Sequence, residues 1–247
     1  MSDLNLVFVS GLTGVGKSTT LGLLQDDVTL LPNRRELTDR IIIPAVQRSR
    51  GEPEQSVSDR LERFELTKTY RETHPDGIVQ ALLEYLQVNP PQPPLREGGS
   101  LVFDNVRGLP ECRAALETFP NSRYIFLDAP PLVRLRRILG REDSFDTVGE
   151  VNAARLENTS FIERLTATKG ADKVFDLYEV ARFEANAGLD DDKILGAVSI
   201  IAKEHENYDS SAAASFLKEN LSDKRLLYVD TSLLGVNEVA AAIRSWL

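Results

Sequence analysis

The segment Gly11–Ser18 constrains the fold of this chain more than any other part of it. It reads GLTGVGKS, in the spacing G-x-x-x-x-G-K-S. This spacing is that of a loop that wraps a phosphate between a buried strand and a helix, because glycines let the backbone approach the anion and the amides at the helix start donate to it. The apolar run at 4–9 predicts the strand, and residues 18–25 can continue as the helix.

The residue types in this loop indicate which parts of a nucleoside triphosphate they would meet. Lys17 is expected to reach the β- and γ-phosphates, and the Ser18 hydroxyl is expected to hold Mg²⁺. Asp104, which ends an apolar run, is expected to support the same metal. The predicted cofactors are therefore ATP and Mg²⁺. The predicted nucleotide-binding residues are Gly11, Thr13, Gly14, Val15, Gly16, Lys17, Ser18 and Thr19.

Strand-like and helix-like segments alternate along most of the chain. Further strands are predicted at 28–31, 101–104, 124–128 and 225–230, and helices at 56–73, 76–88, 131–139 and 236–247. This alternation predicts an α/β fold with a parallel sheet covered by helices on both faces and ligands at the carboxyl ends of the strands. Residues 147–223 show no convincing strand, so we expect a helical insertion there, before the last strand, and a core made of 1–146 and 224–247.

Charge and composition exclude several classes of protein. The net charge is −9, and the acidic excess lies in residues 142–247, which carry 11 basic and 20 acidic residues against 18 of each before them. An acidic half argues against a nucleic-acid track. No apolar run approaches the ~18 residues of a membrane span. One cysteine and two histidines provide neither an intramolecular disulfide nor a zinc cluster.

From these limits, and from an N-terminus without the pattern of a secretory signal, we expect a cytoplasmic protein. Its partner should be a small-molecule substrate, with no nucleic acid and no membrane, and a homodimer is left open.

Two classes that share the loop fit less well. ATPases of the motor and AAA type need an acidic residue after the strand-ending aspartate to activate water, and here Asp104 is followed by Asn105. GTPases need D-x-x-G after a strand, and Asp146–Gly149 matches those letters without a strand before it. The third class, small-molecule phosphotransferases, agrees with more of the chain.

Residues 124–143 resemble the strand, helix and lid of nucleoside monophosphate kinases, and those of thymidylate kinases most. The strand ends in Asp128-Ala129-Pro130-Pro131, and an arginine-rich helix follows. The pair Asp59-Arg60 and the segment Val229–Ser232 also look like features of that family. The resemblance covers about residues 1–146 and 224–247. It implies a P-loop kinase-type fold and transfer of the γ-phosphate of ATP to a small phosphorylated acceptor, in the first place a (deoxy)nucleoside monophosphate.

The chain also departs from that family. Its D-R-[YFH] motif is present here as Asp104-Asn105-Val106, with Arg107 three residues beyond the aspartate, and a minimal thymidylate kinase has no counterpart to 147–223. The resemblance therefore carries over the type of reaction rather than the substrate.

Arginines supply the remaining candidates, because planar guanidinium groups bind phosphate in bidentate fashion. Arg137 and Arg141 are predicted to act with Lys17 in catalysis. Arg35, Arg60 and Arg107 are predicted to bind the acceptor. Two alternatives stay open: a kinase of a non-nucleotide metabolite, and a regulatory nucleotide-binding module whose helical insertion binds a partner.

Overall fold

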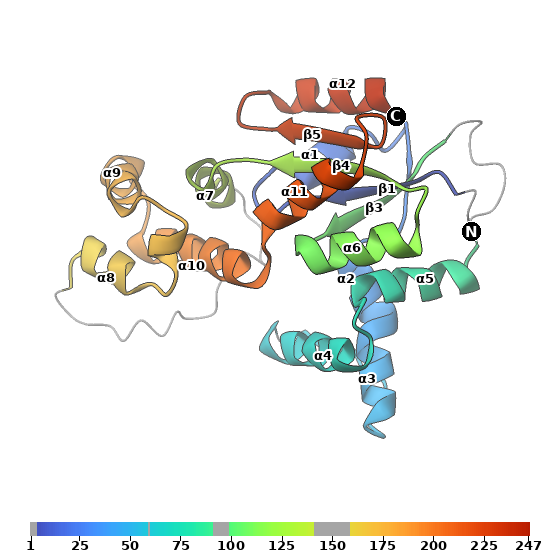
Figure 1. The fold of residues 1–247 in the computed structure, drawn as a ribbon. Helices are drawn as coiled ribbons and strands as arrows, with labels where there is room; N and C mark the ends of the chain where they lie inside the picture. The colour runs from blue at the N-terminus through green and yellow to red at the C-terminus, as the bar shows by residue number, and fades with distance from the viewer. Residues whose placement is uncertain (1–3, 59, 91–98, 141–158) are drawn as a thin grey trace.

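The computed structural model describes residues 4–58, 60–90, 99–140 and 159–247 (Figure 1). Its centre is a five-stranded sheet in the order β2-β3-β1-β4-β5, in which every pairing is parallel. The strands are β1 (Leu6–Ser10), β2 (Thr29–Leu30), β3 (Leu101–Val106), β4 (Arg123–Asp128) and β5 (Leu226–Asp230). The predicted α/β fold with a parallel sheet is confirmed.

Helices connect the strands and cover both faces of the sheet. The α-helices are α1 (Lys17–Gly22), α2 (Arg34–Leu37), α3 (Ile43–Ser49), α4 (Arg60–Thr73), α5 (Ile78–Val88), α6 (Gly108–Thr118), α7 (Pro131–Leu139), α8 (Phe161–Ala167), α9 (Leu177–Ala187), α10 (Asp191–Asn207), α11 (Ser210–Asn220) and α12 (Val236–Trp246). A π-helical turn, η1 (Thr38–Ile42), joins α2 to α3, and a 3₁₀ turn, η2 (Ala171–Lys173), precedes α9. The helix expected from residue 56 begins at Arg60.

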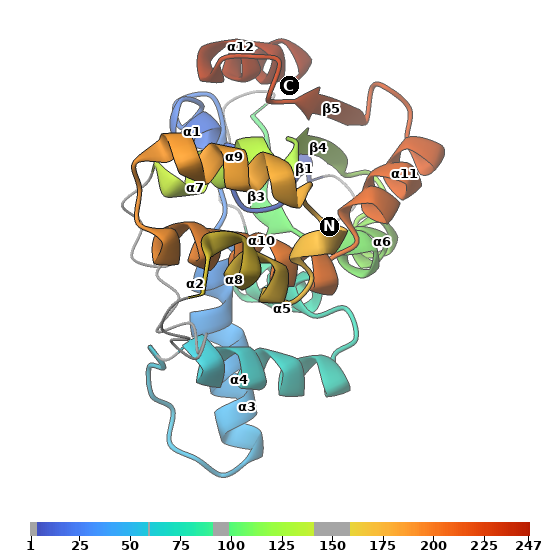
Figure 2. The same cartoon turned by 90° about the vertical axis from the view of Figure 1, so that its left-hand side faces the viewer.

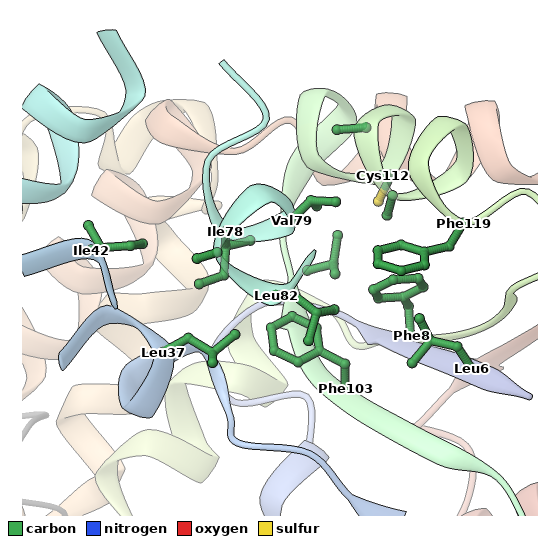
Figure 3. Close-up of a cluster of buried hydrophobic side chains, with 14 of the residues drawn as sticks. Leu6, Phe8, Leu37, Ile42, Ile78, Val79, Leu82, Phe103, Cys112 and Phe119 are labelled. Carbon is green, nitrogen blue, oxygen red and sulfur yellow. The ribbon is translucent and has the colours of Figure 1, made fainter. Parts of the chain in front are cut away.

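Alternation of side chains along each strand builds a separate core on each face, because successive residues of a strand point to opposite sides. On one face Leu6 and Phe8 of β1 meet Phe103 of β3, together with α5 and α6 (Figure 3). On the other face Val7 and Val9 pack with apolar residues of α1 and α12. Both faces of the sheet are therefore buried, as the near-continuous apolar strands require.

The carboxyl ends of the strands lie on the side of the molecule where α7 and α10 are found (Figure 1). There Leu135 and Ile138 of α7 pack against α8, α9 and α10 in a third apolar cluster. Figure 2 looks onto this side, with α8, α9 and α10 toward the viewer. Helix α11 contacts α6 instead, and Ala213 and Leu217 belong to the first face of the sheet.

The predicted helical character of the segment before β5 agrees with α8 to α11 over its described residues, whereas the boundary at 147–223 stays a prediction. Within the described ranges, no helix combines the length and the apolar character needed to cross a membrane.

Candidate active site

Two glycines with left-handed backbone angles shape the loop between β1 and α1. Gly11 and Gly14 have φ angles of +140° and +87°, which side-chain-bearing residues rarely adopt. A Cβ at Gly11 would lie 2.4 Å from the carbonyl oxygen of Leu127, and one at Gly14 would lie 2.9 Å from that of Arg134. Both glycines are thus required by the close packing of the loop on β4 and α7.

The side chain of Lys17 folds back over this loop. Its ammonium donates to the carbonyl oxygen of Gly11 at 2.6 Å and to that of Leu12 at 3.1 Å. Burial lowers the pKa of Lys17 to about 8, although the negative charge of Asp104 opposes this. An incoming phosphate would supply the counter-charge that this buried ammonium needs.

A cavity of about 880 Å³ opens over the loop and extends well beyond it. It is lined by the loop, by Thr19 and Thr20 of α1 and by the turn that leads from β5 into α12. Polar side chains of α2, η1, α4, the segment before α4, β3 and the turn after β3 line it as well. These are Arg34, Arg35, Thr38, Ser58, Arg63, Thr67, Asp104, Asn105 and Arg107. A single cavity therefore contains the predicted nucleotide loop and several arginines.

Asp104 is the clearest candidate for holding a metal. It lies in β3, two residues before the strand ends at Val106, and its Oδ1 is buried without a hydrogen-bond partner in the described part of the chain. Burial raises the pKa of the Asp104 carboxyl, against the opposing charges of Lys17 and Arg107. Ser18 is exposed and lines the same cavity. A carboxylate oxygen without a partner and a hydroxyl that lines the same cavity fit Mg²⁺, a cation that takes oxygen ligands.

The described residues contain no group of three or more histidine, cysteine or acidic side chains that could hold a metal ion. A magnesium ion here would therefore depend on phosphate oxygens and water for its remaining ligands, as is usual for this ion.

Arg107, predicted to bind the acceptor, reaches the cavity from the turn after β3. Its Nε donates to Oδ1 of Asn105 at 2.6 Å, and its Nη1 lies 3.1 Å from Oε1 of Glu204. Asn105 has a φ of +88°, and among the described residues no other non-glycine residue has a positive φ. Such strain persists where surrounding contacts impose it, and it gathers at functional sites.

Arg137, predicted to be catalytic, lines the cavity and is bonded to Thr231 and to the loop. Its Nη1 donates to the hydroxyl of Thr231 at 2.8 Å and to the carbonyl oxygen of Gly14 at 3.3 Å, while Nη2 donates to the carbonyl oxygen of Thr231 at 2.6 Å. It thereby ties α7 to the loop and to the end of β5. Its catalytic role stays a prediction.

Of the other three predicted arginines, the structure describes the side chain of Arg35 alone. Arg35 of α2 is exposed and lines the cavity. Arg60 is the first residue of α4, and its side chain is outside what the structure describes. Arg141, the second predicted lid arginine, also lies outside the described residues.

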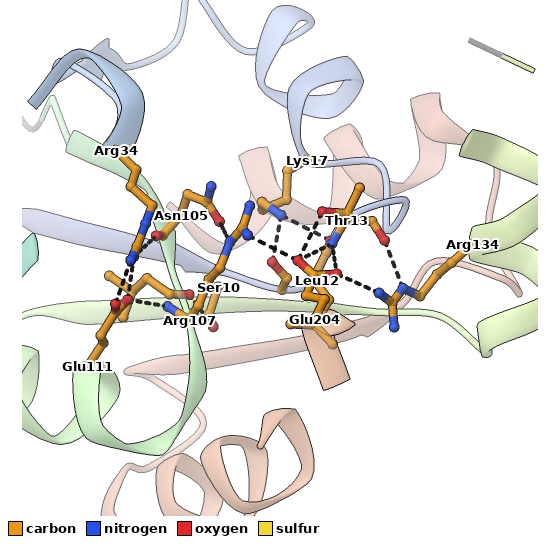
Figure 4. Close-up of polar contacts among 12 residues, drawn as sticks. Ser10, Leu12, Thr13, Lys17, Arg34, Asn105, Arg107, Glu111, Arg134 and Glu204 are labelled. Atoms are coloured by element: carbon orange, nitrogen blue, oxygen red, sulfur yellow. Dashed lines mark hydrogen bonds and ion pairs between the residues drawn. The ribbon is translucent and has the colours of Figure 1, made fainter. Parts of the chain in front are cut away.

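Glu204 of α10 is a site residue that the sequence did not reveal. Its carboxylate accepts from the Thr13 amide at 3.0 and 2.9 Å and from the Thr13 hydroxyl at 2.9 Å, and it pairs with Arg134 at 2.7 Å (Figure 4). One acidic residue among many in the acidic half carries no signal of this contact, because 191 positions separate it from Thr13. Only the packing of α10 against α7 brings it to the loop.

A second pair, Arg34 with Glu111, was also missed. The guanidinium donates to both carboxylate oxygens, at 2.6 and 2.8 Å, and the carboxylate also accepts the Arg107 amide at 2.8 Å. Tyr208, which follows α10, stands near both arginines, with its ring centre 5.9 Å from Cζ of Arg34 and 5.6 Å from Cζ of Arg107. Arg34 and Arg107 are therefore held in fixed positions.

Comparison with known proteins gives little beyond the architecture. No protein-family model matches the chain, and no curated protein matches its sequence. The chain is similar to a sugar kinase from Janibacter sp., with 13% identity, a TM-score of 0.44, and coverage of 98% of this chain and 94% of that one. It is also similar to TT1252 from Thermus thermophilus, with 16% identity, a TM-score of 0.41, and coverage of 99% and 98%. At such values the residues of the site must decide the function.

Proposed function

We propose that this chain is a P-loop kinase that transfers the γ-phosphate of ATP to a small phosphorylated acceptor, in the first place a (deoxy)nucleoside monophosphate. One observation supports this above all: a single cavity is lined both by the loop at Gly11–Ser18 and by several guanidinium groups. Phosphoryl transfer needs two anionic groups brought in line and their charge neutralised, and this arrangement supplies both requirements.

The donor would occupy the end of the cavity that contains the loop. Amides at the start of α1 and the buried ammonium of Lys17 would bind its β- and γ-phosphates. Leu234, Val236 and Val239, from the turn after β5 and from α12, line the same end and offer apolar contacts to a nucleobase. Arg137 would keep that turn in register with the loop through Thr231.

The acceptor would occupy the other end. Arg35 and Arg107 line the cavity, and so do Thr38, Ser58 and Thr67, which carry hydroxyl groups. Guanidinium groups recognise phosphate oxygens, and hydroxyl groups recognise the polar part of a nucleotide or of another metabolite. The predicted contribution of Arg60 belongs to the same end.

Ser18 and Asp104 would hold Mg²⁺, which when bound neutralises charge on the β- and γ-phosphates. The chain's own groups position the reactants: Lys17 beside the transferring phosphate, and Arg107 between the loop and the acceptor. Because a phosphate acceptor is already ionised at neutral pH, the reaction needs no side chain to remove a proton from it.

The test is phosphoryl transfer from ATP across a panel of nucleoside and deoxynucleoside monophosphates, read as acceptor-dependent release of ADP. Lys17→Ala should abolish turnover while the far-UV circular dichroism stays that of the wild type. Lys193→Ala, at an exposed position of α10, is the matched control and should leave turnover unchanged.

Turnover in Lys17→Ala at the wild-type rate would refute the role of the loop. Silence of the wild type across the panel would favour the two alternatives. Sugars and coenzyme precursors would then be assayed as acceptors, and nucleotide binding without any turnover would indicate the regulatory module.

A further inference from the structure

Glu204 links the last turn of α10 to the phosphate-binding loop. It is only 6% exposed, and each of its carboxylate oxygens has several donors. The Thr13 amide lies within 3.0 Å of both oxygens, Arg107 is bound at Oε1, and Arg134 is bound at Oε2 (Figure 4). The donors come from the loop, from the turn after β3 and from α7. One carboxylate therefore fixes three separate segments around the cavity.

These contacts set the orientation of the Arg107 guanidinium. Asn105 holds its Nε, and Glu204 holds its Nη1. A planar group anchored at two of its nitrogens cannot rotate about its own axis, so its position at the cavity is determined by these two partners. Tyr208, one turn beyond Glu204, adds a ring 5.6 Å from the same guanidinium. The end of α10 therefore provides two of the groups that surround Arg107.

A different interpretation is that Glu204 occupies the place of a phosphate and leaves when a nucleotide binds. The surroundings of Arg134 argue against it. This arginine is 4% exposed, and its Nε donates to the carbonyl oxygen of Thr13 at 2.7 Å. Withdrawal of Glu204 would leave a buried guanidinium without the carboxylate to which it is bonded, which is strongly unfavourable.

The charge of this cluster is also compatible with a bound phosphate. Around the Lys17 ammonium, the positive charges of Arg107 and Arg134 are opposed by the negative charges of Asp104 and Glu204. With Lys17 included, three positive groups face two carboxylates beside the loop, so Glu204 does not on balance repel an incoming anion.

We propose that Glu204 is a positioning residue for phosphoryl transfer, which acts by holding the Arg107 guanidinium between the loop and the acceptor. This inference rests on the proposed kinase function. Its consequence is that α10 takes part in the reaction through a carboxylate that binds the loop and Arg107.

The experiment compares Glu204→Gln, Arg107→Gln and the double variant in acceptor-dependent turnover, with the Kd of a fluorescent ATP analogue measured in parallel. Glu204→Gln keeps the shape of the side chain and loses its charge. Because misplacing a group by about 1 Å can cost on the order of 100-fold in rate, we expect kcat to fall about 10- to 100-fold while the Kd changes less than about threefold. The double variant should lose no more than about threefold beyond Arg107→Gln.

The matched control is Glu206→Gln, which makes the same chemical change on the same helix at an exposed ion pair with Lys169. It should leave kcat unchanged. If Glu204→Gln does not fold, Asn105→Gly serves in its place, because it removes the other anchor of Arg107 at a position whose φ glycine adopts readily. The same loss of kcat is expected.

Three outcomes would overturn the role of Glu204 and leave the proposed function standing. They are turnover of Glu204→Gln at the wild-type rate, additive losses of kcat in the double variant, and nucleotide binding that weakens by the same factor as kcat. Tighter nucleotide binding in Glu204→Gln would instead support the displaced-carboxylate interpretation and refute ours. Absence of turnover in the wild-type protein would overturn the proposed function together with this inference.

Discussion

Replacing Lys17 by methionine should stabilise the nucleotide-free protein while it abolishes the reaction. The ammonium of Lys17 is 8% exposed, and burial lowers its pKa from the ordinary 10.5 to about 8. One pK unit corresponds to 1.36 kcal/mol, so keeping this group charged in the folded state costs about 3 kcal/mol. The attraction to Asp104 is already contained in the shift.

Methionine has a similar length and no charge, so it removes this cost. The carbonyl oxygens of Gly11 and Leu12 lose their donor in exchange, and each such hydrogen bond contributes on the order of 1 kcal/mol. The expected net gain in the free energy of unfolding is therefore about 1–2 kcal/mol at pH 7. A variant that is more stable but inactive shows the trade-off between stability and activity that is common at functional sites.

The pH dependence of this gain follows from the direction of the shift. Since the pKa of Lys17 is lower in the folded state than in the unfolded chain, the cost is present in full below about pH 8. It declines as the pH rises from there toward 10.5, where the group is neutral in both states. The advantage of Lys17→Met should accordingly disappear near pH 10.

The measurement is urea-induced unfolding without nucleotide, at pH 7 and at pH 9.5. Lys193→Met is the control, because that lysine is exposed and its replacement should change the free energy of unfolding by less than about 0.5 kcal/mol. A Lys17→Met variant that is less stable than the wild type at pH 7 would refute the reasoning. So would an advantage that stays the same at both pH values.

Two further changes test the packing of the site. Gly14→Ala should lower the free energy of unfolding by about 2–4 kcal/mol, because its Cβ would meet the backbone of Arg134. Gly16→Ala, at a position with open space around it, should lower it by only about 1–2 kcal/mol. Equal losses for the two variants in thermal or urea unfolding would contradict this. Glu111→Gln should lower the free energy of unfolding, measured in urea, by about 2–4 kcal/mol, because the Arg34 guanidinium loses its bidentate carboxylate. A double variant with Arg34→Met and Glu111→Leu should recover part of that loss.

The sequence was sufficient to predict the sheet, because its strands are apolar runs bounded by turns and because the loop at Gly11–Ser18 belongs between a strand and a helix. The burial of every residue of β1 follows from the same rules, because both faces of a parallel sheet are covered. The strand predicted to end at Asp104 continues to Val106. The π-helical turn at Thr38–Ile42 carried no such pattern.

Lys17 could be assigned to the candidate site from a local motif, and Asp104 and Arg107 from their place near the carboxyl end of a predicted strand. Glu204 and Glu111 could not be assigned in this way, since each is one carboxylate among many until tertiary packing selects it. The positions of Arg34 and Arg107 are likewise set by partners far away in the chain.

The contact between Thr13 and Glu204 has a consequence for the order in which the protein can form. During synthesis the loop leaves the ribosome early, but β1 pairs with β3 and β4, which begin at Leu101 and Arg123. The carboxylate that binds the loop amide arrives 191 residues after Thr13. Non-local pairing of this kind delays folding until most of the chain is available. A nascent chain that stops short of α10 therefore carries the sequence motif for phosphate without the finished site.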